Sequence, residues 1–479
     1  MSVAPRTVAP SPQATGAVRR SRSEIRALTG LRIVAATWVV LFHFEGQLVP
    51  YVEQLPGVHA VLSAGWIGVE LFFVLSGFVI ARSYLDECGR RWSTAGAARF
   101  VLNRFARVWP AWMAVTVVAC AWLVVCPRLG LNPNVVSGHP PLELTTLLRQ
   151  VTMTQMWGES SLIDVSYVAP GWSISAEWLA YLAFPVLALA MRPLLRAHPA
   201  ANLVLATAAM SPLALTAFLH GTDDIEMNWV LRIACSFTAG ILGSCAVAGL
   251  EGTERGERWG RRLTTAGLVV GAVVLLWANW RSGQDLAAGG EVGKYAAVAV
   301  LCWPPLIAGL ALSDGAPARF LSRDAMVYGG RISYCLYLVH WVVRDVGMAV
   351  LGRDPAAPGW GAYTPGGALV VPVLIALCFV GAAGLYHGVE EPARRRLVRL
   401  WGGRRAVDTG VPAQRPPAAT GPASAEEAAT SRWPAPVTGA LARPWPLDAP
   451  PRPRAAAPAL PPTGVPPAAD EAPAAGPRR

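Results

Sequence analysis

The stretch Leu31–Phe44, with the sequence LRIVAATWVVLFHF, decides how the rest of the chain is interpreted. It is an apolar segment of helical character, interrupted by two ionisable residues, Arg32 and His43, eleven positions apart. At about 100° per residue, eleven steps make about three turns, so both side chains lie on one face. They stand roughly 16 Å apart along the helix axis. If the helix spans a membrane, this face needs a protein-lined or wet path, because lipid penalises both groups.

The overall composition indicates a polytopic membrane protein and not a soluble globular enzyme. Hydrophobic residues make up 53% of the 479 residues, and charged residues make up only 15%. The formal net charge of +11 would be consistent with nucleic-acid binding, but forty of the 41 basic residues are arginine and only Lys294 is lysine. This bias, together with abundant alanine, glycine and proline, is typical of a GC-rich genome. We therefore expect no nucleic-acid partner.

The eight cysteines give no sign of a metal site. They lie mostly inside apolar runs and lack metal-ligand spacing, so we expect small core residues and no bound metal. The polar segment 1–24 precedes the first apolar run, and no signal-peptidase cleavage motif follows that run. We interpret this segment as a retained cytoplasmic tail.

Ten apolar runs are long enough to cross a bilayer, which takes about 20 helical residues. This pattern predicts an all-α fold, a polytopic membrane helix bundle of about ten transmembrane helices within a domain of residues 25–400. The runs are residues 25–47, 61–82, 109–126, 171–191, 201–219, 228–248, 264–281, 294–312, 329–351 and 366–388.

The distribution of basic residues supports an even number of spans. Five arginines precede or begin the first run, and six follow the last within residues 389–405. The connections alternate: segments 82–108, 192–200, 249–263 and 313–328 carry six, two, four and two basic residues, whereas 48–60, 127–170, 220–227, 282–293 and 352–365 carry none, two, none, none and one. By the positive-inside rule, the first group and both termini face the cytoplasm.

The end of the chain changes composition sharply. From Val411 onward, 18 of 69 residues are proline, and alanine fills much of the remainder. Such a segment has too little apolar bulk to form a core, so we expect the region 401–479 to be a disordered cytoplasmic tail.

Two connections are more than turns. Residues 90–108 form a basic, amphipathic stretch on the predicted cytoplasmic side, which suits either an anchor helix or an anion site. The predicted outer segment 127–170 is the longest loop, contains a candidate interfacial helix near 142–156, and is long enough to cover an outward-facing cavity.

Several sequence blocks resemble the acyltransferase 3 family, integral membrane O-acyltransferases that modify bacterial surface polysaccharides and some antibiotics. The resemblance extends over about residues 25–400, with all blocks in the same order. The blocks are Arg32 with His43; GWIGVELFFVLSGF at 65–78; NRFARVWP at 103–110; WSISAEWLAY at 172–181; GRISYCLYLVHW at 330–341; and VEEP at 389–392.

This resemblance implies that His43 is catalytic and that acyl-coenzyme A, usually the acetyl form, is the donor. A histidine can accept the proton of a sugar hydroxyl as its oxygen attacks the thioester carbonyl. It can also act as the nucleophile and form an acyl-imidazole, and the sequence leaves both mechanisms open. The implied acceptor is a carbohydrate or a glycosylated small molecule. The implied location is the bacterial cytoplasmic (inner) membrane, with the lipid bilayer as a further partner.

The resemblance also implies that Arg104 and Arg107, three residues apart, bind the phosphates of the donor, with Arg32 close to the same group. Arginine forks suit phosphate oxygens, although simple anchoring to the cytoplasmic surface is the alternative. Glu70 stands where the family more often has aspartate, and Trp178 replaces a second acidic residue that commonly follows Glu177.

The roles of the two acidic residues stay open. Glu70 or Glu177 is expected to orient His43 or to contact the acceptor, and the alternative is a hydrogen bond that holds helices together. Glu177 is expected at a depth similar to that of His43. In the ninth span, His340 and Tyr337 are interpreted as packing or lining residues and not as catalytic ones.

A transporter or flippase is the rival function, because ten spans with buried charges serve transport equally well. No convincing internal repeat supports it. A purely structural scaffold does not explain a charge and a histidine on one apolar helix face. Thermal stabilisation by coenzyme A would favour the enzyme over the transporter.

Overall fold

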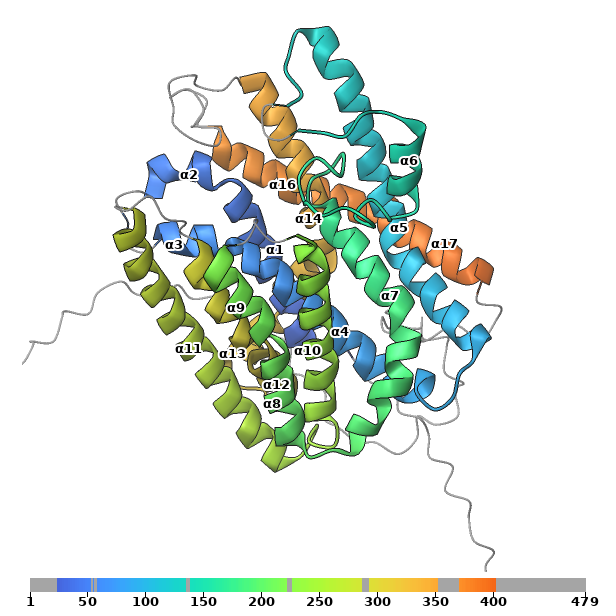
Figure 1. Cartoon of the computed structure of the whole chain (residues 1–479), viewed down its shortest axis with the longest axis vertical. Helices are drawn as coiled ribbons and strands as arrows, with labels where there is room; N and C mark the ends of the chain where they lie inside the picture. Colours follow the sequence, from blue (N-terminus) through green and yellow to red (C-terminus); the bar gives the residue numbers. More distant parts are fainter. Residues whose placement is uncertain are drawn as a thin grey trace, which may run out of the picture. The chain divides into compact units, whose positions relative to one another are not determined.

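The computed structural model describes residues 24–52, 55, 58–134, 138–221, 226–286, 293–351 and 370–401 (Figure 1). All regular secondary structure within these residues is helical, which confirms the predicted all-α class. The chain divides into two units, Met1–Ala413 and Gln414–Arg479, and every described residue belongs to the first. The predicted tails, 1–24 and 401–479, lie outside the described residues except for Glu24 and Trp401.

Ten helical segments among the described residues are long and apolar enough to span a membrane, as the hydropathy pattern predicted. They are built from α1 (Arg26–His43); η1 (Ala64–Trp66) with α4 (Ile67–Cys88); α5 (Thr94–Val125) with η2 (Cys126–Leu129); α7 (Gly171–Met191) with η3 (Arg192–Arg196); α8 (Pro199–Ala209) with α9 (Ser211–His220); α10 (Asn228–Val247); α11 (Glu254–Leu286); η4 (Gly293–Cys302) with α12 (Trp303–Leu312); α14 (Asp324–Leu351); and α16 (Val371–Leu385) with η5 (Tyr386–Glu390) and α17 (Glu391–Trp401). The shorter helices are α2 (Glu45–Val52), α3 (Val58–Ser63), α6 (Leu144–Val151) and α13 (Ala316–Leu321).

The third span differs from the expectation. The basic stretch 90–108 was expected to be a connection before a span at 109–126, but α5 runs without interruption from Thr94 to Val125, with Pro110 inside it. Ser93 begins this helix as its N-cap, accepting a hydrogen bond from the Gly96 amide at 3.1 Å. Arg104 and Arg107 therefore project from the spanning helix itself and not from a separate surface helix.

Two pairs of helices form the centre of the bundle, α1 with α14 and α4 with α10 (Figure 1). A methyl group on Gly330 of α14 would lie 1.8 Å from the carbonyl oxygen of Thr29, so only glycine allows α1 to come this close. Further along both helices, His43 is hydrogen-bonded to His340. Since the contacts follow the same order on both helices, α1 and α14 are parallel.

The described parts of the predicted connections lie at two opposite ends of the bundle, which we call the Arg26 end and the His43 end after the two ends of α1. The connection 352–365 lies outside the described residues. Ion pairs join the connections at the Arg26 end. At the His43 end, a backbone hydrogen bond joins two connections, and a histidine of the loop 127–170 pairs with a carboxylate of α14. The pairs are Arg26 with Asp324, Arg82 with Glu251 and Arg192 with Asp86 at the first end, and Met227 with Ser160 and His139 with Asp345 at the second. This grouping matches the two sets of connections that charge counting separated.

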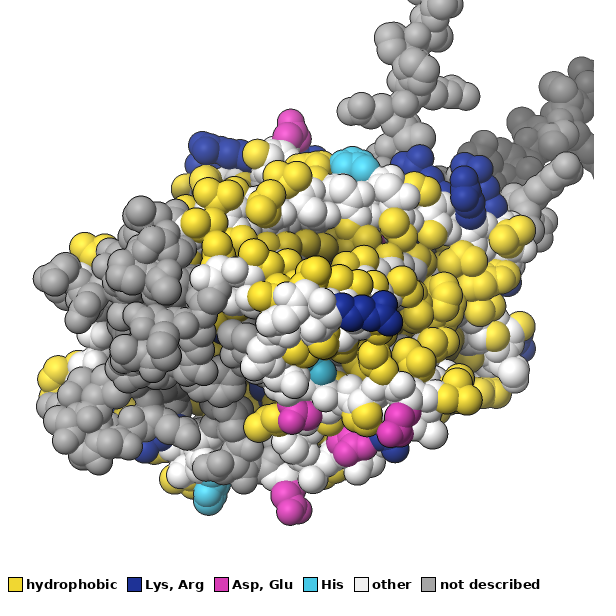
Figure 2. Space-filling model, turned by 90° about the horizontal axis from the view of Figure 1, so that it is seen from above, with side chains coloured by type: hydrophobic (Ala, Val, Ile, Leu, Met, Phe, Trp, Pro, Cys, Tyr) yellow, Lys and Arg dark blue, Asp and Glu magenta, His cyan; other side chains and the backbone are white. Residues whose placement is uncertain are grey.

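The outer surface of the bundle is apolar where lipid would lie. On α11, at one edge of the bundle in Figure 1, large hydrophobic side chains are exposed in a row, among them Val269, Val273 and Leu276. Figure 2 shows one face of the molecule, on which hydrophobic side chains cover most of the described surface and few charged ones lie among them. Such a surface suits hydrocarbon and not water.

Candidate active site

His43, the last residue of α1, forms a pair with a second histidine. Its Nδ1 lies 3.0 Å from Nε2 of His340, on α14, and the two ring centroids are 5.0 Å apart. His340 is fully buried, whereas His43 keeps part of its surface accessible. The histidine that sequence analysis assigned to packing is therefore the direct hydrogen-bond partner of the proposed catalytic residue.

The hydrogen bonds assign a proton to each ring of this histidine pair. Nδ1 of His340 lies 3.2 Å from the carbonyl oxygen of Leu336, which can only accept, so this nitrogen carries a proton. In neutral His340, Nε2 is then an acceptor, and Nδ1–H of His43 donates to it. The lone pair of His43 is left on Nε2, the atom that would take a proton or attack a carbonyl.

Three arginines, Arg32, Arg104 and Arg107, form a second group that we call the arginine cluster. Arg32 is an electrostatic neighbour of Arg104 and of Arg107, although α1 and α5 are far apart in the sequence. The Nε atoms of Arg32 and Arg104 are buried and have no hydrogen-bond partner among the described residues. Buried donors of this kind require an acceptor, and phosphate oxygens would supply it.

Arg107 differs from the other two, because it has a carboxylate partner. It forms an ion pair with Glu390, which is fully buried and also lies 3.0 Å from the thiol of Cys335. Glu390 ends η5, a π-helical turn, and a π-turn adds a residue and so changes which side chain faces inward. The next residue, Glu391, pairs instead with Arg394 and Arg395.

Glu177 lies with the arginine cluster and not with His43. It accepts a hydrogen bond from the Tyr181 hydroxyl and is an electrostatic neighbour of Arg32. Tyr181 is in turn an electrostatic neighbour of Arg104. No hydrogen bond joins Glu177 to His43 among the described residues. The expected depth similar to that of His43 is therefore corrected, because Glu177 is an electrostatic neighbour of Arg32, which stands about three helical turns before His43.

Glu70 holds helices together. It is fully buried and ion-paired with Arg232 of α10, whose guanidinium carbon lies 4.4 Å from the ring centroid of Trp172 and 5.4 Å from that of Trp66. This contact joins α4, α7 and α10. Of the two alternatives that sequence left open, the described contacts of Glu70 match the link between helices, and none reaches His43.

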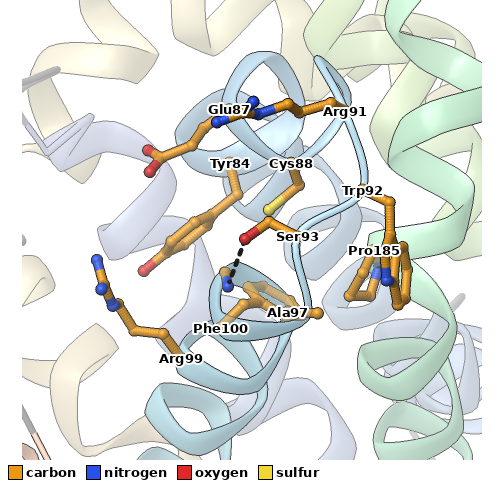
Figure 3. Close-up of a pocket in the computed structure, with 11 residues that line it drawn as sticks. Tyr84, Glu87, Cys88, Arg91, Trp92, Ser93, Ala97, Arg99, Phe100 and Pro185 are labelled. Atoms are coloured by element: carbon orange, nitrogen blue, oxygen red, sulfur yellow. Dashed lines mark hydrogen bonds between the residues drawn. The ribbon is translucent and has the colours of Figure 1, made fainter.

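A small pocket opens at the Arg26 end, where α4 leads into α5 (Figure 3). It has a volume of about 120 Å³, and Arg91, Trp92, Ser93 and Arg99 are among the residues that line it. Tyr84 lines the same pocket, and the guanidinium carbon of Arg104 lies 5.8 Å from the centroid of its ring. The pocket thus adjoins the arginine cluster through one shared aromatic ring.

The loop 127–170 is described over residues 127–134 and 138–170. This part of the loop packs closely onto the His43 end. Its helix α6 is shorter than the expected 142–156, and Trp112 of α5 donates a hydrogen bond to the carbonyl oxygen of Gln150 at 2.7 Å. Burial raises the pKa of Tyr167 to about 12, so its hydroxyl stays protonated and donates to the carbonyl oxygen of Pro141 at 2.9 Å. These contacts hold the loop against the bundle.

Comparison with known proteins identifies the family. The acyltransferase 3 family model, described as an acyltransferase domain, matches residues 25–386. The chain belongs to the acyltransferase 3 family. It is also 27% identical over 399 residues to the acyltransferase MdmB of Streptomyces mycarofaciens, with 80% of this chain and 94% of that protein covered.

A shorter match links this acyltransferase to protein 2 in the picA locus of Rhizobium radiobacter. The two are 34% identical over 104 residues, which cover 22% of this chain and 48% of that protein. No solved structure matches the chain. The family and the ten spanning helices together make this chain a multi-pass membrane acyltransferase.

Sequence reasoning missed two residues of this acyltransferase's candidate site. His340 lies within the block GRISYCLYLVHW and Glu390 within VEEP, so both belong to blocks that carry the family resemblance. The available signal was that each is an ionisable residue within or beside an apolar run, where an unpaired charge or ring nitrogen is costly. Neither pattern indicates which residue the side chain contacts.

Proposed function

We propose that this acyltransferase moves an acyl group, usually acetyl in its family, from acyl-coenzyme A to a hydroxyl of a carbohydrate or glycosylated acceptor. The observation that carries the proposal is the hydrogen bond between Nδ1 of His43 and His340, at the opposite end of α1 from the arginine cluster, since it leaves the lone pair of His43 on Nε2. A base and an anion site on one helix face, roughly 16 Å apart, match a substrate whose phosphates and thioester are far apart.

His43 would act as the general base. The acceptor oxygen attacks the thioester carbonyl while its proton passes to Nε2 of His43, and the carbon–sulfur bond then breaks. The departing thiolate takes the proton from Nε2, which leaves His43 neutral for the next cycle. The acyl-histidine alternative uses the same atom, since Nε2 would then attack the carbonyl carbon directly.

The donor's phosphates would lie against the arginine cluster. Arg32 and Arg104 supply buried N–H groups without partners in the described part of the chain, which is the chemistry that phosphate oxygens complete. The pocket beside Tyr84 offers Arg91, Arg99 and an exposed Trp92 for the nucleotide end. No metal is needed for either step.

The orientation of the chain follows from the basic connections. We infer that the Arg26 end, with both termini, faces the cytoplasm of the bacterial inner membrane, because four arginine-bearing connections meet there. The phosphates cannot enter the hydrocarbon layer, since burying their charge is prohibitive. The pantetheine arm would therefore extend between helices to His43, and the acceptor would approach from the outer side, beside the loop 127–170.

A vectorial assay tests this function. In sealed vesicles with the Arg26 end outside, labelled acyl-coenzyme A added outside should label an acceptor trapped inside. Labelling confined to the outside acceptor would contradict the arrangement across the membrane. A transporter or flippase, the rival function, predicts instead that coenzyme A neither stabilises the protein against heat nor supports any transfer.

We expect Arg104→Ala to weaken donor binding and leave the chemical step nearly unchanged. A charge-assisted contact with phosphate is worth about 1.5–3 kcal/mol, so the KM for acyl-coenzyme A should rise about 10- to 100-fold. Arg128→Ala, at the other end of the same helical span and exposed, is the matched control. An unchanged KM in Arg104→Ala would return Arg104 to the role of a surface anchor.

A further inference from the structure

We propose that the acceptor's hydroxyl groups bind to a row of three side chains that leads away from His43 toward the loop, formed by Trp341, Asp345 and His139. This inference rests on the proposed function and names the acceptor subsite of the same reaction. None of the three side chains has a role in the proton transfer described above.

The three side chains form a continuous row that starts beside the base. The Trp341 ring stands edge-on to His43, with ring centroids 5.1 Å apart. Asp345 follows four residues later on α14, so it lies on the same face of the helix, one turn further on. From the loop, Nε2 of His139 comes within 3.5 Å of Oδ2 of Asp345. The row therefore begins at the reacting histidine and ends beneath the loop.

All three side chains are buried, and each has a polar atom without a hydrogen-bond partner in the described structure. Trp341 is 6% exposed and Asp345 is 5% exposed, and the side chain of His139 is 4% exposed. The atoms without partners among the described residues are Nε1 of Trp341, Oδ1 of Asp345 and Nε2 of His139. A buried polar atom without a partner costs about 1–3 kcal/mol, so three in one row point to a ligand that completes them.

The hydrogen-bonding character of these atoms selects the ligand. Nδ1 of His139 lies 3.0 Å from Oδ1 of Asn134 and Nε2 lies 3.5 Å from Oδ2 of Asp345, so both ring nitrogens face acceptors. The row then offers the N–H groups of Trp341 and His139 as donors and the Asp345 carboxylate as an acceptor. Adjacent hydroxyls of a sugar match this set, because each can donate and accept.

The charge around the row is consistent with a neutral ligand. The guanidinium carbon of Arg344 lies 5.1 Å from the ring centroid of Trp341 and disfavours a cationic acceptor there. The Asp345 carboxylate disfavours an anionic one. A neutral polyol avoids both repulsions, whereas a simple apolar alcohol with one hydroxyl would leave part of the row unsatisfied.

The test compares two acceptors of different hydroxyl content. Enzyme in nanodiscs would transfer radiolabelled acetyl from acetyl-coenzyme A to methyl α-glucopyranoside and, separately, to cyclohexanol. Trp341→Phe keeps the ring and removes only the N–H, and Asp345→Asn keeps the shape and removes the charge. Trp122→Phe is the control, because among the described residues its Nε1 also lacks a partner and its ring makes no contact with His43.

We expect Trp341→Phe to raise the glucoside KM about 3- to 10-fold and Asp345→Asn to raise it about tenfold or more, with the KM for acetyl-coenzyme A and transfer to cyclohexanol unchanged. A uniform loss with both acceptors, or an unchanged glucoside KM, would show that His139 and Asp345 only fasten the loop, and would overturn the subsite. If wild-type enzyme transfers acetyl to neither acceptor, nor to extracted cell glycans, the proposed function fails as well.

Discussion

His43→Ala is expected to lower kcat by about 10²- to 10⁴-fold, because one imidazole both accepts and returns the proton during acyl transfer. The loss corresponds to about 3–5 kcal/mol of transition-state stabilisation. Donor binding should change little, since the arginine cluster lies at the other end of α1. Product formation by the purified variant, measured with saturating acetyl-coenzyme A, gives kcat directly.

His387→Ala is the matched control for this variant. His387 is exposed and lies 3.1 Å from the Tyr328 hydroxyl, so it is a hydrogen-bonded histidine outside the histidine pair. It should retain nearly full activity. If His43→Ala is well folded and forms product at nearly the wild-type rate, the assignment of the base is wrong.

The second large effect concerns His340, which we expect to act as a positioning residue. His340→Leu removes the acceptor for Nδ1–H of His43, so the ring can rotate or exchange its proton to the wrong nitrogen. We expect kcat to fall about 10- to 100-fold with both KM values nearly constant, a smaller loss than in His43→Ala because the base itself remains.

His340→Gln separates positioning from simple packing. The side-chain oxygen of glutamine can stand near the place of Nε2 and accept the same hydrogen bond, so this variant should recover most of the activity lost in His340→Leu. Equal losses in both variants, together with equal falls in melting temperature, would mean that His340 serves only to pack α14 against α1.

The spans were predictable because hydropathy is a property of each segment of the sequence by itself. Each apolar run is long enough to be recognised without knowing its neighbours, and the charge of the connections gave the two ends. The uninterrupted course of α5 was not predictable in the same way. Hydropathy marks only the apolar half of that helix, whereas its backbone hydrogen bonds continue through Arg104 and Arg107.

The candidate site was predictable residue by residue but not pair by pair. The face shared by Arg32 and His43 follows from helical periodicity alone. The partner of His43 is 297 positions away, and only the packing of α1 on α14 brings the two together. Likewise, Glu70 meets Arg232 because α4 and α10 pack in parallel, and Arg107 meets Glu390 because a π-turn redirects that side chain.

Because of the glycine contact between α1 and α14, the histidine pair depends on the number of residues between Gly330 and His340. Gly330 fixes the two helices against each other beside Thr29, and His340 follows ten residues later. One residue added or removed within that interval would turn the second ring by about 100° and move it about 1.5 Å along the axis. The apolar residues of the interval can therefore be exchanged for others of similar size, whereas their number cannot change without separating the two imidazoles.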